Sequence, residues 1–178
     1  MTDEPLIVPP YGPSAVPDND LDLLRRLVKQ FAVQTVVEFG PGRSTYVFLN
    51  EGCRVWSYEY DPKYLAKITK ALGTHERLTL QPFVNASQVT FEPPPGKVDL
   101  VFVDSPSQHH SPGMPKTCRL DVTLAATRLS DRILLHDAKR PGEKGTSAEL
   151  VRRGWTSVFL KSQLGMFLFE RRPCQSSG

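Results

Sequence analysis

Short apolar runs alternate with amphipathic segments along this chain of 178 residues, and this alternation constrains the fold more than any other feature. Five runs have the composition of β-strands, and they cover residues 35–39, 54–60, 78–83, 98–104 and 132–137. Helical patterns lie around and between them, at residues 18–31, 44–51, 61–72, 116–129 and 147–154. Strands that are joined through helices pair in parallel and become covered on both faces. The sequence therefore predicts an α/β fold with a doubly wound, mostly parallel sheet.

The last two expected strands, residues 155–161 and 165–172, have no helix between them. Neighbours with so short a connection pair as an antiparallel hairpin. We therefore expect a seven-stranded sheet that carries this hairpin at one edge. The chain divides into a proline-rich arm at residues 1–17, a single domain at 18–172 and a flexible tail at 173–178.

The composition excludes several classes of protein. A formal net charge of +3 is too small to indicate nucleic-acid binding, and no apolar run approaches the length of a membrane span. Lys and Arg outnumber Asp and Glu between residues 137 and 172, which favours a solvated basic face over a docking surface for an acidic partner. Cys53, Cys118 and Cys174 are odd in number and widely spaced, and the start of the chain does not have the pattern of a signal peptide. We expect a cytoplasmic protein in a reducing compartment.

The run VVEFGPGRST, residues 36–45, places a glycine-rich turn directly after the first expected strand. In an open parallel sheet, ligands bind beyond the carboxyl ends of the strands, where the winding reverses. Gly40 and Gly42 allow the backbone to turn sharply and to approach a ligand closely. Glu59 ends the second expected strand, where a carboxylate is suited to accept hydrogen bonds from ribose hydroxyls.

The charges of the turn decide which ligand suits it. Pro41 removes one N–H group, Glu38 adds a negative charge, and Ser44–Thr45 stand where a dinucleotide motif has its third glycine. A pyrophosphate requires free N–H groups and positive potential, so it fits poorly. A ligand with ribose, adenine and a cationic end fits better, and S-adenosylmethionine is such a ligand. The alternative for Glu38 is a buried acid that pairs with a structural arginine or a helix N-terminus.

With these residues the chain resembles the class I S-adenosylmethionine-dependent methyltransferases, whose first motif is an acid, one residue and a glycine-rich turn. The resemblance covers residues 18–172, including the seven-stranded Rossmann-like sheet and its closing hairpin. Within the class, the runs VEFGPGRST, VDSP and LLHDAKRPGE are most similar to small, insertion-free enzymes that act on small molecules or sugars.

The resemblance implies S-adenosyl-L-methionine as the cofactor. The implied cofactor contacts are Glu38, Gly40, Gly42, Ser44, Glu59, Asn85, Ala86 and Asp104. In this set the glycine turn serves the methionine end, Glu59 serves the ribose, and the segment VNAS supplies Asn85 and Ala86 beside the adenine.

Three side chains at the ends of the fourth and fifth expected strands are candidates for catalysis, namely Asp104, His136 and Asp137. Transfer of a methyl group needs positioning and a group that accepts the proton of the nucleophile. His136 is the predicted general base because its ordinary pKa lies near neutrality; the alternative is a histidine that only bonds a neighbouring loop. Ser105–Pro106 follows Asp104 in place of an Asn-Pro-Pro-aromatic motif, which favours an oxygen acceptor over an exocyclic base amine.

A divalent metal is not expected. Catechol-type O-methyltransferases hold Mg²⁺ with an acid after the fourth strand and an Asp-Asn pair after the fifth. Asp104 and Asp137 match the two acids, but Ala138 stands in the place of the asparagine. Two carboxylates and water are a thin ligand set for a hard cation.

Candidate substrate contacts lie in loops and at one helix start, and they are His109, His110, Arg119, Lys139, Arg140 and Tyr11. The two histidines lie in the long loop at residues 105–115, where simple exposure to solvent is the alternative. Arg119 opens a helix and is equally suited to a structural ion pair. Tyr11 is a candidate lid residue in the proline-rich arm, with disorder as its alternative.

The sequence thus favours a methyltransferase that modifies an oxygen of a small molecule or sugar. A non-catalytic module that binds S-adenosylmethionine or a nucleoside is the alternative from another class, and an NAD-dependent oxidoreductase and an aminopropyltransferase are further alternatives. The hairpin edge and the N-terminal arm are candidate contacts for a homodimer, although no feature requires one.

Overall fold

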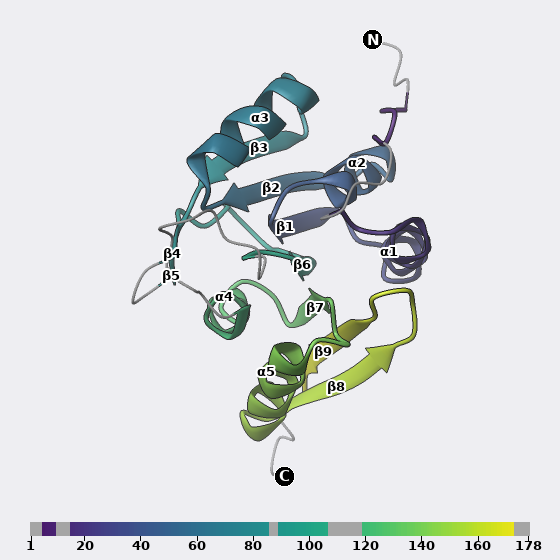
Figure 1. Ribbon diagram of the computed structural model, residues 1–178, viewed down its shortest axis with the longest axis vertical. Coiled ribbons are helices and arrows are strands. Elements are labelled where there is room, and N and C mark those ends of the chain that lie inside the picture. Colours follow the sequence, from purple (N-terminus) through teal and green to yellow (C-terminus); the bar gives the residue numbers. More distant parts are fainter. Residues whose placement is uncertain (1–4, 10–14, 86–88, 107–118, 173–178) are drawn as a thin grey trace.

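The chain folds into one seven-stranded sheet between two layers of helices (Figure 1). The computed structural model describes residues 5–9, 15–85, 89–106 and 119–172. The helices are α1 (Asp18–Gln30), α2 (Arg43–Asn50), α3 (Pro62–Leu72), α4 (Arg119–Ala126) and α5 (Pro141–Arg152). The strands are β1 (Thr35–Phe39), β2 (Arg54–Glu59), β3 (Leu78–Pro82), β4 (Val84–Asn85), β5 (Val89–Thr90), β6 (Leu100–Val103), β7 (Arg132–His136), β8 (Trp155–Leu160) and β9 (Met166–Arg171).

The order of the large sheet is β3-β2-β1-β6-β7-β9-β8. β1 pairs in parallel with both β2 and β6, so the winding reverses between β1 and β6. β9 lies antiparallel between β7 and β8, and it closes the sheet as the expected hairpin. The predicted α/β class, the doubly wound sheet and the edge hairpin are therefore confirmed.

Alternating side chains of the central strands build two separate cores. In β6, Leu100 and Phe102 join the cluster beneath α1, α2 and α3, whereas Val101 and Val103 join the cluster beneath α4 and α5. All four side chains are completely buried. A strand covered on both faces is nearly all apolar, which explains the uninterrupted run that identified this strand in the sequence.

Two local features differ from the sequence prediction. α5 begins at Pro141, six residues before the expected start, so residues 141–146, which lay outside the expected helix, are helical. Pro141 occupies the first turn, where its missing N–H costs nothing, and Arg140 before it has extended backbone. The antiparallel pair β4–β5 was not expected either, because strands of two residues leave no periodic pattern.

The described part of the proline-rich arm is fastened to α2. Both backbone groups of Leu6 bond the Asn50 side chain, at 2.7 and 2.8 Å. The Arg43 guanidinium donates to the carbonyl oxygens of Pro9 and Val16, each at 2.7 Å, and to the Asp18 carboxylate at 2.5 Å. The arm thus runs along the helix that follows the glycine turn.

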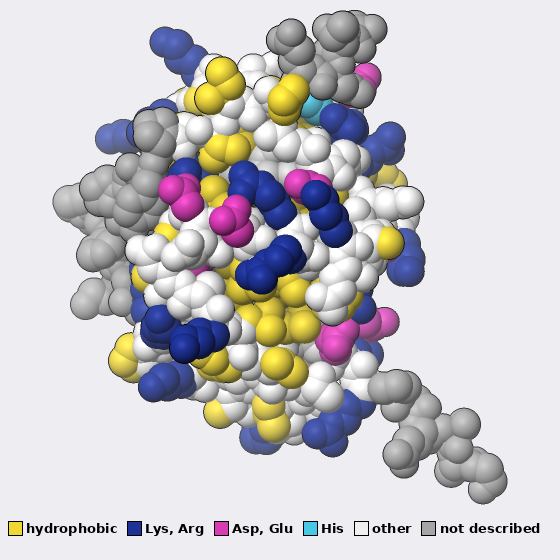
Figure 2. Space-filling view, turned by 90° about the vertical axis from the view of Figure 1, so that its right-hand side faces the viewer, with side chains coloured by type: hydrophobic (Ala, Val, Ile, Leu, Met, Phe, Trp, Pro, Cys, Tyr) yellow, Lys and Arg dark blue, Asp and Glu magenta, His cyan; other side chains and the backbone are white. Residues whose placement is uncertain are grey.

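The surface agrees with the modest net charge. On the face shown in Figure 2, Lys and Arg side chains are spread among acidic and hydrophobic ones and do not merge into one continuous patch. Within the described ranges, no helix combines the length and the apolar character that crossing a membrane requires.

Candidate functional site

A pocket of about 510 Å³ opens at the carboxyl ends of β1 and β6, where the winding of the sheet reverses. The arm, the glycine turn, α3 and Asp104 line it. A larger groove of about 660 Å³ lies at the opposite ends of the strands, near Asp99 and Arg132. Ligands of open parallel sheets bind beyond the carboxyl ends, so the smaller pocket is the candidate site.

Gly40 is required where β1 enters the turn. Its backbone has a φ of +95°, and an added Cβ would lie 2.8 Å from the Cβ of Ser105 and 3.0 Å from the Ser105 nitrogen. Both the conformation and the close approach to the end of β6 therefore select glycine. Gly42 has extended backbone at φ −178°, and an added Cβ there would come no nearer than 3.7 Å to the Tyr64 hydroxyl. Its contact with a ligand stays a prediction, although it lines the pocket.

Glu38 lies completely buried beneath the turn and does not line the pocket. Its carboxylate accepts hydrogen bonds from Ser44 and Ser57, each at 2.5 Å, and from Thr45 at 2.6 Å. Burial raises the pKa of Glu38 to about 7, against the lowering effect of the three hydroxyls. A direct contact between Glu38 and a cationic ligand is therefore not available in this arrangement. Its visible role is to hold Ser44 and Thr45 at the start of α2, which matches the alternative of a buried acid at a helix N-terminus.

Glu59 ends β2 as expected and is buried. One carboxylate oxygen accepts hydrogen bonds from the backbone N–H groups of Tyr60 and Asp61, both at 2.8 Å. Burial raises the pKa of Glu59 to about 7. Asn85 lies in β4, and Ala86 lies outside the described residues. Ribose and adenine contacts at these positions remain predictions.

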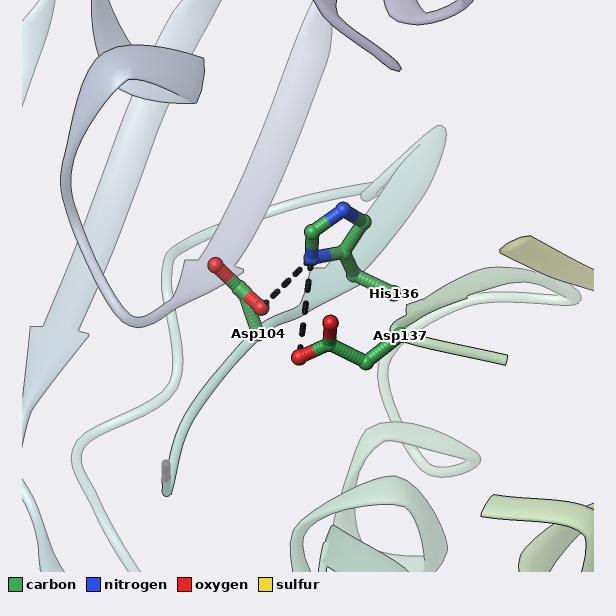
Figure 3. Close-up of side chains that lie close together, drawn as sticks. All are labelled: Asp104, His136 and Asp137. Atoms are coloured by element: carbon green, nitrogen blue, oxygen red, sulfur yellow. Dashed lines mark hydrogen bonds and ion pairs between the residues drawn. The ribbon is translucent and has the colours of Figure 1, made fainter. Parts of the chain in front are cut away.

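The strand ends of β6 and β7 bring Asp104, His136 and Asp137 together, as the sequence suggested (Figure 3). The Nδ1 atom of His136 lies 2.8 Å from Oδ1 of Asp104 and 3.9 Å from Oδ2 of Asp137. The other oxygen of Asp104 points away from His136 (Figure 3), and the Asp104 side chain is 17% exposed. Asp104 is therefore the member of this cluster that reaches the pocket.

His136 is held on both sides by carboxylates. Its Nε2 atom lies 2.9 Å from Oδ2 of Asp20, and the residue is only 2% exposed. Burial alone would lower the pKa of this imidazole, but the carboxylates of Asp104 and Asp20 outweigh burial and raise the pKa to about 9. The ring is protonated at neutral pH and has no free nitrogen lone pair. It is therefore poorly suited to the general-base role that the sequence suggested, and it matches the alternative of a histidine with satisfied bonds.

Asp20 was missed by sequence reasoning. It is completely buried in the first turn of α1, and its carboxylate also accepts hydrogen bonds from the backbone nitrogens of Gln163 and Leu164, at 2.7 and 3.2 Å. Asp20 thus joins α1, β7 and the hairpin turn. One signal was present, because Asp20 precedes Leu24 and Leu27 by four and seven residues and so lies on the apolar face of the helix.

Arg119 binds the cluster from the start of α4. It donates to the carbonyl oxygens of Pro106, His136 and Asp104, at 3.1, 2.9 and 2.7 Å. Its Nη2 atom also lies 3.1 Å from Oδ1 of Asp104 and 2.9 Å from Oδ2 of Asp137. The Arg119 side chain is only 3% exposed, so it matches the alternative of a structural ion pair better than a contact with a substrate anion.

The charges around Asp104 keep it ionised. Burial acts to raise the pKa of Asp104, but the positive charges of His136 and Arg119 prevail and hold the pKa below its ordinary value. Asp137 is buried, and Arg140 pairs with it at 2.8 Å. Both carboxylates are thus neutralised mainly by cations of the chain itself.

Of the remaining predicted substrate residues, Lys139 and Arg140 are described, and neither lines the pocket. The Lys139 ammonium donates to the carbonyl oxygens of Ser162 and Gln163, at 3.0 and 2.7 Å, and so holds the hairpin turn. Arg140 is engaged by Asp137 through Nη2, while its Nη1 has no partner among the described residues. His109, His110 and Tyr11 lie outside the described residues.

The cluster does not fit a divalent cation. Ligand atoms of Asp104, His136 and Asp137 lie within 4.8 Å of one another, which is close enough for a metal site. However, the Arg119 guanidinium already contacts both carboxylates, and both nitrogens of His136 are engaged. A metal would meet a positive charge where it needs free oxygen ligands.

Comparison with known proteins identifies the fold. No family model and no curated sequence matches the chain, whereas solved methyltransferase structures do. The SAH-bound methyltransferase PaMTH1 of Podospora anserina superposes with a TM-score of 0.66 at 14% identity, over 90% of this chain and 81% of that chain. The chain adopts the class I methyltransferase fold.

Two further structures share the arrangement. An O-methyltransferase of Bacillus cereus in complex with SAH has a TM-score of 0.64 at 16% identity, over 90% of this chain and 84% of that chain. The glycopeptide N-methyltransferase MtfA, complexed with sinefungin, has a TM-score of 0.60 at 17% identity, over 90% and 88% of the two chains. At such identities the likeness concerns the fold.

The requirement for glycine at the turn can be measured with a matched pair. Gly154 has a φ of +88°, similar to that of Gly40, but among the described residues an added Cβ there would meet no atom within 4 Å. We expect Gly154→Ala to lower the free energy of unfolding by about 1–2 kcal/mol through backbone strain alone. Gly40→Ala should cost clearly more, because strain and overlap with Ser105 add. Urea unfolding measures both variants, and equal losses would contradict the close approach.

The protonation of His136 predicts how stability depends on pH. The folded protein retains this proton up to a pKa of about 9, whereas an unfolded histidine loses it near its ordinary value of 6.5. Between these values the native state binds one more proton, so stability falls as pH rises. From this group, the equilibrium constant for unfolding should increase about tenfold per pH unit between roughly pH 7 and 9. In His136→Gln this contribution should disappear, and equal slopes in the two proteins would show that His136 does not hold the proton.

Proposed function

We propose that this protein transfers a methyl group from S-adenosyl-L-methionine to a small molecule. The observation that carries the proposal is the meeting of the glycine turn and the Asp104 carboxylate in one pocket at the reversal of the sheet. Structures with the same fold are methyltransferases crystallised with SAH or with sinefungin, which supports this choice of cofactor.

The electrostatics of the pocket favour a cationic cofactor. Asp104 remains ionised because its pKa is lowered, and Pro41 in the glycine turn has no N–H to offer a phosphate. A sulfonium or an ammonium group gains energy near such a carboxylate, whereas a pyrophosphate is repelled. The NAD-dependent alternative is therefore less well supported than S-adenosylmethionine.

Asp104 is the residue that we propose faces the acceptor. Its Oδ1 atom is tied to His136 and Arg119, which leaves the oxygen that points away from His136 for a ligand. S-adenosyl-L-methionine, bound at the glycine turn, would supply the methyl group and a neutral thioether as leaving group. The acceptor oxygen would bond to the methyl carbon as the carbon–sulfur bond breaks. The acceptor oxygen becomes strongly acidic as it gains the methyl group, so even a weak base such as Asp104 can take its proton.

His136 and Asp137 then act as positioning residues. His136 holds Asp104 from one side and is itself fixed by Asp20. Asp137 is buried and pairs with Arg119 and Arg140. Neither side chain has a free acid or base group directed at the pocket. This proposal moves the general-base role from His136, which the sequence favoured, to Asp104, which was also among the catalytic candidates.

Oxygen of a small molecule or sugar is the acceptor that we propose. The chain has Ser105–Pro106 after Asp104 in place of the motif that binds an exocyclic amine, which favours an oxygen acceptor. Similar structures include an O-methyltransferase and an N-methyltransferase, so a nitrogen acceptor is the alternative to test.

The state of the one cysteine that the structure describes is consistent with a reducing compartment such as the cytoplasm. Cys53 is free and buried, and burial raises the pKa of its thiol to about 11. Such a thiol is unreactive at neutral pH. We therefore propose a cytoplasmic protein, as the cysteine usage suggested.

Calorimetric titration tests the cofactor. We expect S-adenosylmethionine and S-adenosylhomocysteine to bind with one site per chain and NAD to show no binding. Binding of NAD alone would contradict the proposal. If the sulfur ligands bind but a panel of hydroxyl and amine metabolites yields no methylated product, the non-catalytic binding module is the correct alternative.

Asp104→Asn separates the charge of this residue from its shape. We expect turnover to fall about 100-fold or more, because the variant loses the proton acceptor. Affinity for S-adenosylmethionine should fall more than affinity for S-adenosylhomocysteine, because only the former carries a sulfonium charge. Asp121→Asn, on the exposed side of α4, is the matched control and should change neither quantity. Unchanged turnover in a folded Asp104→Asn variant would remove Asp104 from the reaction.

A further inference from the structure

The position of one Arg119 nitrogen goes beyond an ordinary ion pair. Nη2 lies 3.1 Å from Oδ1 of Asp104 and 2.9 Å from Oδ2 of Asp137. These two carboxylates belong to the group of side chains that lie close enough together to hold a metal ion. The nitrogen therefore occupies the space between the two acids where a shared cation would be bound.

We propose that the Arg119 guanidinium takes the place of a divalent cation between Asp104 and Asp137, so that the reaction centre is built without a metal. The guanidinium supplies the positive charge that Asp104 and the buried Asp137 require when they lie so close together. It also supplies several N–H donors in one plane, and the surrounding carboxylate and carbonyl oxygens can accept hydrogen bonds from them.

The same side chain joins the two strand ends as a bridging ion would. Arg119 donates to the carbonyl oxygens of Asp104 and Pro106 after β6, and to that of His136 at the end of β7. The oxygen atoms that a hard cation would use as ligands are thus already occupied by N–H donors. Glu143 adds a further carboxylate 3.7 Å from Nε.

A bound divalent ion would be repelled by two guanidinium groups. Arg119 and Arg140 both contact Oδ2 of Asp137, at 2.9 and 2.8 Å. In a buried site such charges are weakly screened. The arrangement therefore excludes a metal as long as Arg119 is present, and it contains a latent metal site that opens when Arg119 is removed.

Binding of Mn²⁺ alone tests this inference, and the measurement does not depend on methyl transfer. Electron paramagnetic resonance reports free Mn²⁺ during titration of the protein. We expect the wild-type chain to show no site that depends on Asp137. We expect Arg119→Ser to bind Mn²⁺ about tenfold more tightly than the wild type or better, because the guanidinium no longer occupies the two carboxylates and three carbonyl oxygens that it contacts. Mn²⁺ should also raise the unfolding temperature of Arg119→Ser and not that of the wild type.

Three variants complete the test. Asp137→Asn combined with Arg119→Ser should lose the gained Mn²⁺ site. Arg119→Lys keeps a positive charge between the acids and should gain none. Arg132→Ser removes an arginine that pairs with Glu170 at the surface, and it should gain none either.

Two results would overturn the proposal. One is a wild-type Mn²⁺ site that disappears in Asp137→Asn. The other is a folded Arg119→Ser variant that binds Mn²⁺ no better than Arg132→Ser. If Arg119→Ser does not fold, even with Mn²⁺ present, the wild type and Asp137→Asn still decide whether the native centre takes a metal.

Discussion

The Arg119 guanidinium at the ends of β6 and β7 is the interaction on which the candidate site depends. A buried guanidinium is stable only when its donors are bonded and its charge is compensated. Here backbone carbonyl oxygens of both strand ends and the carboxylates of Asp104 and Asp137 meet these needs. Arg119 therefore links the backbone that shapes the pocket to the charged side chains that act in it.

A second chain of contacts runs from α1 through the same place. Asp20 holds His136, and His136 holds Asp104, so a helix on one face of the sheet helps to orient the carboxylate at the crevice. In such a row each charged group is stabilised by its neighbours, which explains why the imidazole gains a proton while the carboxylates remain ionised. The cluster works as a fixed electrostatic frame, and only Asp104 extends from it into the pocket.

Local patterns predicted most of the architecture. The apolar run of β6 and the start of α3, where Asp61 caps the helix and Pro62 opens it, follow from requirements that act within a few residues, and so does the positive φ of Gly40. Where local signals conflict, prediction was less accurate. Pro141 and Gly145 have the composition of a loop, yet they lie in the first turns of α5. The proline is harmless at the start of a helix, and packing outweighs the low helix propensity of a single glycine.

The sequence by itself determined that acidic side chains would meet at the carboxyl ends of parallel strands, because strand order and direction fix that edge. Only the tertiary structure decided their partners and protonation. His136 pairs with Asp20, which lies 116 positions earlier in the chain. Glu38 accepts hydrogen bonds from hydroxyl groups beneath the turn and does not face a ligand. Periodicity reports which face of an element is buried, but not which charged group lies across the interface. The pKa of a buried side chain depends on the charged group packed against it, and the chemistry that the side chain can perform depends on that pKa.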